Sequence, residues 1–271
     1  MVMFRIGKAI LWLGLNLILI LYLASAFRMR VPVLCFHEIL ESASANPLSW
    51  EKNRFDNLIV RLKGLGYDFI LPDSIVSPND YLTKKQIILT FDDGTLDHLD
   101  TVLPLLNKQE IPGLFFWISS ELNKLDSDQR QKLVRNLKLS KLGSHTTQWK
   151  SMLEMSEEQR VNEFDHSIAD LRHYVSYSIT NFAFPRGEYD AKLALMALKR
   201  FENVFSVDYG YFWPGINKVH GRFMLNSNSS YSEIQEYLAR SKPFKQWDFW
   251  VLLISLIMLN FLLIFRKKLG F

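Results

Sequence analysis

Two adjacent carboxylates, Asp92 and Asp93, stand at the end of an apolar run within residues 87–94, directly before Gly94. Such a run predicts a buried strand that releases both side chains at its carboxyl end, where α/β folds place their chemistry. Neighbouring carboxylates repel unless a cation or hydrogen-bond donors offset their charge, so the pair suggests a metal ligand beside a general base. A strand followed by an ordinary Asp-Gly turn is the structural alternative.

Polar residues also follow other predicted strands. His37 ends a strand-like run at residues 31–37, His145 follows the short segment 139–142, and Pro185-Arg186-Gly187 follows a strand predicted at 180–184. His37 by itself could cap its strand or line a site. Together, these strand ends would offer polar groups to one face of a barrel-like sheet.

The elements that must position these residues alternate along the chain. Apolar residues at helical spacing predict helices at 50–66, 99–106, 127–138, 156–175, 190–200 and 232–239, and apolar runs predict further strands at 67–71, 114–118 and 204–209. Ser156 and Gln159 form a capping-box pattern. His98, His166 and His173 are expected on helix surfaces, and residues 213–230 form an irregular loop near the site. The alternation predicts parallel strands with helical crossovers.

Both ends of the chain are strongly apolar. Residues 9–27 are long enough to cross a bilayer, and residues 249–265 run into the basic cluster Arg266-Lys267-Lys268, which favours a cytoplasmic C-terminus. Ala24-Ser25-Ala26 has the form of a processing site, so residues 1–30 are either an anchor or a cleaved signal. We expect a domain at 31–245 and a transmembrane helix with a basic tail at 246–271. The expected location is the cell membrane, with the domain on the extracytoplasmic side.

The formal charge of +4 is concentrated at these ends. Of the 32 Lys and Arg residues, seven lie in residues 1–30 and 266–271, which hold no acid, so the domain carries 25 against 28 Asp and Glu, or about −3. A mildly acidic domain lacks the basic face that nucleic acid requires, and no nucleic-acid partner is expected. The single cysteine, Cys35, lies in an apolar run, which favours a buried thiol.

These motifs stand in the order of a known family. The chain from residue 31 to about 225 resembles the polysaccharide deacetylases of carbohydrate esterase family four, through Phe36-His37, Thr90-Phe91-Asp92-Asp93-Gly94, Ser144-His145-Thr146 and Phe182-Ala183-Phe184-Pro185-Arg186-Gly187. The resemblance implies an α/β fold, a distorted (β/α) barrel that removes acetyl groups from amino sugars. It also implies a divalent metal, Zn or similar, and a polysaccharide substrate at the membrane.

Roles carry over from the family by position. Asp92 would be the general base, and Asp93 and His145 would be metal ligands. Arg186 stands where the family often has Tyr, and its charge could orient Asp92. His220 is the candidate for the acid that protonates the leaving amine. The residues expected to line the substrate site are His37, Trp149, Pro185 and Gly187.

The chain departs from the family at one position. The second motif should read His-x-x-x-His, but Trp149 stands where the second His belongs, and an indole nitrogen is only a donor. Gln148 could supply a weak oxygen ligand instead. Two hypotheses follow: a membrane-tethered, metal-dependent deacetylase of a cell-envelope or exported polysaccharide, or a catalytically degenerate relative that binds glycan or a partner in an envelope assembly. A deacylase acting on another small amide or ester would use the same residues.

Overall fold

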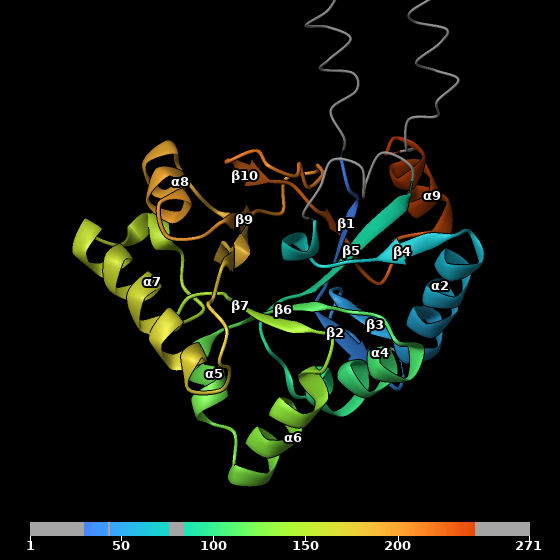
Figure 1. The fold of residues 1–271 in the computed structure, drawn as a ribbon, viewed down its shortest axis with the longest axis horizontal. Helices are drawn as coiled ribbons and strands as arrows, with labels where there is room; N and C mark the ends of the chain where they lie inside the picture. The colour runs from blue at the N-terminus through green and yellow to red at the C-terminus, as the bar shows by residue number, and fades with distance from the viewer. Residues whose placement is uncertain (1–29, 43, 76–83, 242–271) are drawn as a thin grey trace, which may run out of the picture. The chain divides into compact units, whose positions relative to one another are not determined.

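A nine-stranded sheet organises the described part of the chain, and every pairing within it is parallel (Figure 1). Its order is β10-β9-β8-β7-β6-β5-β1-β11, with β4 also paired to β5. The strands are β1 (Val33–Phe36), β4 (Tyr67–Phe69), β5 (Lys85–Phe91), β6 (Leu114–Trp117), β7 (Lys141–Ser144), β8 (Asn181–Ala183), β9 (Asn203–Phe205), β10 (Val219–His220) and β11 (Phe223–Met224). The parallel sheet that the alternating pattern predicts is confirmed.

The computed structural model describes residues 30–42, 44–75 and 84–241. All of these residues belong to one unit, Arg30–Lys242, whose α-helices surround the curled sheet (Figure 1). They are α2 (Lys52–Gly64), α4 (Leu103–Gln109), α5 (Ser119–Asn123), α6 (Ser127–Leu137), α7 (Glu157–Arg172), α8 (Ala191–Leu198) and α9 (Tyr231–Ala239). None of the helices in the described ranges has the length and apolar character needed to cross a bilayer, and both expected anchors lie essentially outside those ranges.

The two edges of the sheet are joined by consecutive residues. β10 pairs with β9 and β11 pairs with β1, although only Gly221 and Arg222 separate β10 from β11 in the chain. Backbone hydrogen bonds hold this crossing on both sides, from the Arg222 amide to the Asp208 carbonyl at 2.9 Å and from the Leu225 amide to the Cys35 carbonyl at 2.9 Å. The sheet is therefore a curled half-barrel of the kind expected for a distorted (β/α) barrel, and the chain passes from one of its edges to the other at Gly221 and Arg222.

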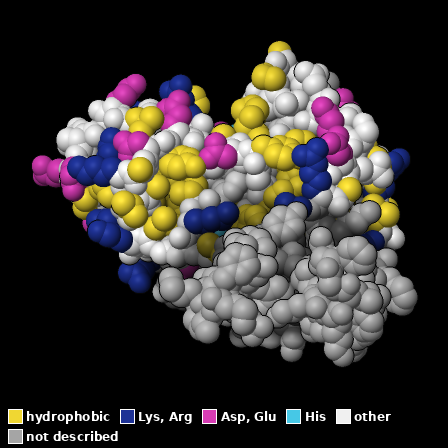
Figure 2. Space-filling view, turned by 90° about the horizontal axis from the view of Figure 1, so that it is seen from above, with side chains coloured by type: hydrophobic (Ala, Val, Ile, Leu, Met, Phe, Trp, Pro, Cys, Tyr) yellow, Lys and Arg dark blue, Asp and Glu magenta, His cyan; other side chains and the backbone are white. Residues whose placement is uncertain are grey.

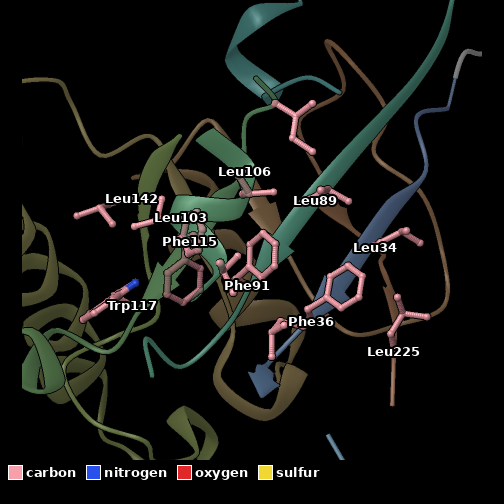
Figure 3. Packing of buried hydrophobic residues seen from close by; sticks show 14 of the residues in the cluster. Leu34, Phe36, Leu89, Phe91, Leu103, Leu106, Phe115, Trp117, Leu142 and Leu225 are labelled. Atoms are coloured by element: carbon pink, nitrogen blue, oxygen red, sulfur yellow. The ribbon is translucent and has the colours of Figure 1, made fainter. Parts of the chain in front are cut away.

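Alternate side chains of the strands build two hydrophobic clusters. Phe36, Phe91 and Phe115, from the neighbouring strands β1, β5 and β6, stack in a row with centroid separations of 5.6 and 4.7 Å (Figure 3). Residues of opposite register on the same strands belong to the second cluster, as Ile88 and Leu114 do. Because side chains alternate along a strand, Asp92 falls in the register of Ile88 and Thr90. The predicted burial of Cys35 is confirmed.

Of the predictions for single residues and short elements, some are confirmed and others are wrong. The capping box of Ser156 and Gln159 is confirmed, and His166 and His173 are exposed as expected. The expectation for His98 is wrong, because His98–Val102 forms a π-helical turn and the His98 ring is fully buried between Phe91 and Phe115. The short pair β2 (Glu38–Leu40) and β3 (Ser49–Glu51) and the helix α5 were not expected from the sequence.

Charged side chains are mixed on the face seen in Figure 2. Lys and Arg side chains there are separated by acidic and hydrophobic ones, and they do not gather in one patch. Clustered basic residues are what a nucleic-acid surface presents. This face offers no such cluster.

Candidate active site

The side chain of Asp92 is held by Arg222 at the seam of the barrel. Arg222 Nη1 donates to Asp92 Oδ1 and Nη2 donates to Oδ2, both at 2.7 Å, and the two residues are 0% and 2% exposed. Further donors of Arg222 reach Thr90 Oγ1 at 3.1 Å and the Ser206 carbonyl at 2.9 Å. Burial alone would raise the pKa of Asp92, but Arg222, His145 and His37 outweigh it and hold that pKa well below its usual range. Asp92 is therefore ionised.

Asp93 and His145 meet at the carboxyl ends of β5 and β7. Asp93 has a left-handed backbone, with φ of 73°, and its carboxylate Oδ1 lies 3.4 Å from His145 Nε2. The other ring nitrogen, His145 Nδ1, bonds to the Ala183 carbonyl at 2.8 Å. Because a carbonyl only accepts, Nδ1 carries a proton and Nε2 faces the carboxylate. Either a proton or a cation must lie between Nε2 and Oδ1, since two lone pairs would repel.

This arrangement fits a divalent metal held by two protein ligands. A metal-binding His commonly donates its remaining N–H to a backbone carbonyl, which orients the ring as Ala183 does here. Position 149 supplies no third ligand, because the indole nitrogen of Trp149 is only a donor. Its side chain is 59% exposed and lies near Arg186, whose guanidinium carbon is 5.7 Å from its ring centre. Gln148 is exposed as well. Asp93 and His145 would leave the remaining coordination positions to water or substrate.

A second group of ligand-type atoms does not fit a metal. Cys35, His37 and Asp92 each offer an atom within 4.8 Å of the others. Both oxygens of Asp92 are already engaged by Arg222, and burial raises the pKa of the Cys35 thiol, whose sulfur lies 3.6 Å from Asp92 Oδ2. A metal needs the thiolate form of cysteine. This cluster is better described as the buried support of Asp92.

His37 lies beside the carboxylates. Burial lowers the pKa of its ring, and the negative charges of Asp92 and Asp93 only partly oppose that effect. Its Nδ1 is buried and has no hydrogen-bond partner among the described residues. A neutral imidazole with an unused nitrogen is suited to accept a proton and pass it on.

An open cleft of about 780 Å³ begins at Asp93. Its wall includes Glu38, Leu40, Leu96, Asp97 and Trp149. Leu96 and Trp149 are half-exposed apolar side chains, and the indole could stack on a sugar ring. The cleft therefore offers room for a polymer beside the strand ends.

The Pro185-Arg186-Gly187 turn lies after β8, with Arg186 in the left-handed region at φ 59°. The Arg186 side chain pairs with Glu188 at 3.3 Å, so the guanidinium that orients Asp92 is that of Arg222 and the expectation for Arg186 needs correction. Gly187 is required by packing, because a Cβ there would lie 2.2 Å from Val207 Cγ2. Pro185 is buried, and the Gly187 amide donates to the Phe184 carbonyl.

The ring of His220 lies among aromatic side chains. Its ring packs against Phe205 and Phe212, and its Nδ1 accepts the Trp213 amide at 3.2 Å. Burial, with a smaller contribution from Lys218, lowers its pKa to about 3. His220 makes no hydrogen bond or ion pair with Asp92 in the part of the chain that the structure describes, and its expected role as the acid stays a prediction.

Sequence reasoning missed Arg222. It lies in the region expected to be an irregular loop, 130 residues from Asp92. A buried carboxylate requires a cationic partner, which could have prompted a search for one, but no local pattern distinguishes Arg222 from the other arginines.

Comparison with known proteins agrees with the motifs. Residues 79–202 match the family model described as polysaccharide deacetylase. The chain is also similar to YxkH of Bacillus subtilis (strain 168), whose name assigns it to the polysaccharide deacetylases, with 22% identity over 176 residues. That match covers 63% of this chain and 61% of YxkH, so the chain matches about three fifths of the length of this relative.

Solved structures share the fold. The Streptococcus pyogenes deacetylase PplD in complex with acetate has a TM-score of 0.69 at 20% identity, over 78% of this chain and 99% of PplD. IcaB from Ammonifex degensii has a TM-score of 0.65 at 22% identity, over 78% of this chain and 97% of IcaB. At these identities the likeness establishes the architecture of the domain.

Proposed function

We propose that this chain, whose residues 79–202 match the polysaccharide deacetylase family, hydrolyses the amide bond of acetylated amino sugars in a polysaccharide. The observation that carries the proposal is that the Asp92–Arg222 pair and the Asp93–His145 pair share the end of β5, where Asp92 and Asp93 are adjacent. It supplies a permanently ionised carboxylate beside a site for a cation. The cleft that starts at Asp93 supplies room for the glycan.

In this proposal Asp92 accepts a proton from the attacking water. Arg222 keeps the carboxylate ionised and fixes its plane through two parallel hydrogen bonds. A carboxylate with so low a pKa is a weak base, so the water must be made more acidic. A divalent cation held by Asp93 and His145 would lower the pKa of that water and polarise the acetyl carbonyl.

His37 completes the proton transfer in the proposal. The leaving nitrogen needs a proton before the amine departs. Since burial keeps the His37 ring neutral at rest, it can take the proton that Asp92 has accepted, because atoms of the two side chains lie within 4.8 Å. His37 then donates to the amine. His37 therefore takes the role that sequence reasoning assigned to His220.

The test is acetate release from an acetylated amino-sugar polymer by the full chain. The wild-type protein should release acetate, chelation of divalent metal should stop the reaction, and added Zn²⁺ or another divalent ion should restore it. The Asp92→Asn variant should lose at least about 100-fold in rate, as expected for removal of a general base. Full activity after chelation would contradict the metal proposal, and no acetate release from several acetylated glycans would contradict the enzyme.

The exposed Trp149 favours a second candidate, a degenerate domain that binds glycan without cleaving it. Trp149→His restores the missing ligand type and should raise metal affinity by at least about 10-fold if the natural site is weakened, since Zn²⁺ sites usually keep three protein ligands. Trp149→Phe is the control, because it keeps an aromatic ring and adds no ligand. A metal-free wild-type protein whose glycan affinity falls in Trp149→Ala would support binding alone.

We also propose a location. The apolar segments 9–27 and 249–265 would tether the enzyme to the cell membrane, with the domain on the extracytoplasmic side and a cell-envelope or exported polysaccharide as substrate. Membrane pellets should retain the protein after alkaline washing, and protease added to intact cells or spheroplasts should digest the domain. Release by the alkaline wash would contradict the tether, and digestion only after lysis would contradict the orientation.

A further inference from the structure

The turn that follows Asp93 reaches the backbone that carries His37. Asp97 Oδ2 accepts the Ile39 amide at 2.7 Å, and His98 Nε2 bonds to the His37 carbonyl at 2.5 Å. His37 is the single residue between β1 and β2, and the two bonds hold the backbone that directly follows its side chain, at the His37 carbonyl and at the Ile39 amide within β2. Residues 92–98 thus contain both carboxylates, Asp92 and Asp93. The same stretch also forms hydrogen bonds with the backbone at His37, which is the third polar side chain of the site.

A histidine is unusual in the buried, aromatic surroundings of residue 98. Its ring is fully buried and meets Phe91 and Phe115 edge to face, at centroid separations of 5.7 and 5.6 Å. The carbonyl of His37 only accepts, so His98 Nε2 carries the proton, and Nδ1 is left without a hydrogen-bond partner among the described residues. A buried polar atom without a partner costs stability, and a phenyl ring would fill the same space without that cost.

The backbone at His98 is also unusual. His98–Val102 is a π-helical turn ahead of α4, and π-turns occur frequently at functional sites. The wide turn directs the ring toward the interior instead of the helix surface. Packing therefore explains the presence of a ring at position 98, but it does not explain a donor.

We propose that Asp97 and His98 form a clamp that positions His37 against Asp92 and Asp93, with His98 acting as a positioning residue through the His37 carbonyl. This inference rests on the proposed function, in which His37 exchanges a proton with Asp92. Proton transfer is sensitive to displacements of about 1 Å, which can cost on the order of 100-fold in rate. Because only a few residues separate Asp92 from Asp97 and His98, the clamp keeps the distance between His37 and Asp92 constant.

The first test is His98→Phe in the full chain, assayed for acetate release. The phenyl ring keeps the aromatic packing and removes the donor. We expect kcat to fall by at least about 10-fold with KM within about twofold, since His98 is buried away from the cleft. The melting temperature should change little, because losing the bond to the His37 carbonyl and losing the unpartnered Nδ1 act in opposite directions. His98→Gln, which keeps a side-chain N–H donor, should recover part of kcat. Unchanged kcat in His98→Phe, in an active wild-type background, would overturn the clamp.

The second test needs no activity. Amide hydrogen exchange of Ile39 should be at least about 10-fold faster in His98→Phe, because the backbone of residues 37–39 loses one of its two hydrogen bonds to Asp97 and His98. The Leu142 amide, which donates to Tyr177 Oη at 2.7 Å, is the control and should not change. A wild-type protein that releases no acetate would defeat the proposed function, but Ile39 exchange would still decide the clamp. Unaltered exchange at Ile39 would overturn it.

Discussion

Asp92 and Arg222 are buried together, and neither could be buried alone. Removing a charge from water costs several kcal/mol unless a partner and hydrogen bonds offset the loss. Here the guanidinium meets the carboxylate with two parallel bonds, and Thr90 and Ser206 accept further donors of the same guanidinium. The pair therefore links the proposed general base to the crossing between the two edge strands at Gly221 and Arg222.

Arg222→Met should remove that compensation. The expected loss in the free energy of unfolding is about 3–5 kcal/mol, because Asp92 would remain buried without its partner, and acetate release should fall below detection. Denaturant unfolding and the acetate assay measure the two effects. Arg186→Met is the matched control: Arg186 is exposed and pairs with Glu188, so stability should change by less than about 1 kcal/mol. Similar losses of stability in both variants would contradict the assignment of Arg222 as the partner that compensates the buried charge of Asp92.

His220 makes stability depend on pH. Its pKa is about 3 in the folded protein, against about 6.5 for an ordinary histidine, so the unfolded chain binds a proton that the folded chain does not between those values. This contribution to stability is present above pH 6.5 and is lost as the pH falls toward 3.

The corresponding experiment compares wild type with His220→Gln in denaturant unfolding at several pH values. Between pH 6.5 and 5 we expect the wild type to lose on the order of 2 kcal/mol more than the variant. His37, whose pKa is also lowered, contributes in the same direction in both proteins, so the variant should flatten the profile only in part. Identical profiles would show that His220 titrates normally.

At the scale of elements, the turn after β5 depends on Gly94. It has φ of +76°, and a Cβ there would lie 2.5 Å from the Trp117 ring on β6. The left-handed backbone and the close approach of the ring both exclude side chains. The same turn fixes the backbone of Asp93, so this tight contact between neighbouring strand ends orients one proposed metal ligand.

Gly94→Ala should therefore destabilise the protein by about 2–4 kcal/mol, which combines backbone strain with overpacking. Gly66→Ala is the matched control. Gly66 has nearly the same φ, +78°, but no atom lies within 4 Å of the added Cβ, so only about 1–2 kcal/mol of backbone strain is expected. Equal unfolding free energies for the two variants would show that Trp117 yields to the methyl group.

At the scale of the molecule, the two ends of the barrel have different tasks. The carboxyl ends of the strands carry the proposed chemistry. The side chain of Asp73 lies at the opposite end, where several strands begin. It accepts from Lys141, Thr180, Asn181 and Asn203, which lie at or next to the first residues of β7, β8 and β9. In α/β barrels this division between a functional end and a stabilising end is general.

Asp73→Ala tests the division. Loss of the shared acceptor should lower the free energy of unfolding by about 2–4 kcal/mol, because several donors lose their partner at once, while kcat of the folded protein should stay within about twofold. Asp73→Asn keeps one acceptor oxygen and should retain part of the stability. A large fall in kcat at a temperature where the variant remains folded would show that this end also serves the reaction.

Local signals in the sequence were sufficient for much of the fold. Apolar runs and helical spacing located most strands and helices, Ser156 and Gln159 marked a helix start, and the turn residues at Asp92, Asp93 and His145 placed chemistry at strand ends. These features depend on neighbours within a few positions in the chain. That is why Asp93 and His145 could be expected at one edge of a parallel sheet before their separation of 3.4 Å was seen.

Only the tertiary structure decided which residues complete the site. Arg222, and neither Arg186 nor any residue near Asp92 in the chain, neutralises the carboxylate, and His37 lies beside it while His220 is sequestered against Phe212. The contacts of Asp92 with Arg222 and His37 join segments more than 50 residues apart, and they arise because the curled sheet brings its two edges together at Gly221 and Arg222. No local pattern encodes that closure, since it follows from the packing of all the strands at once.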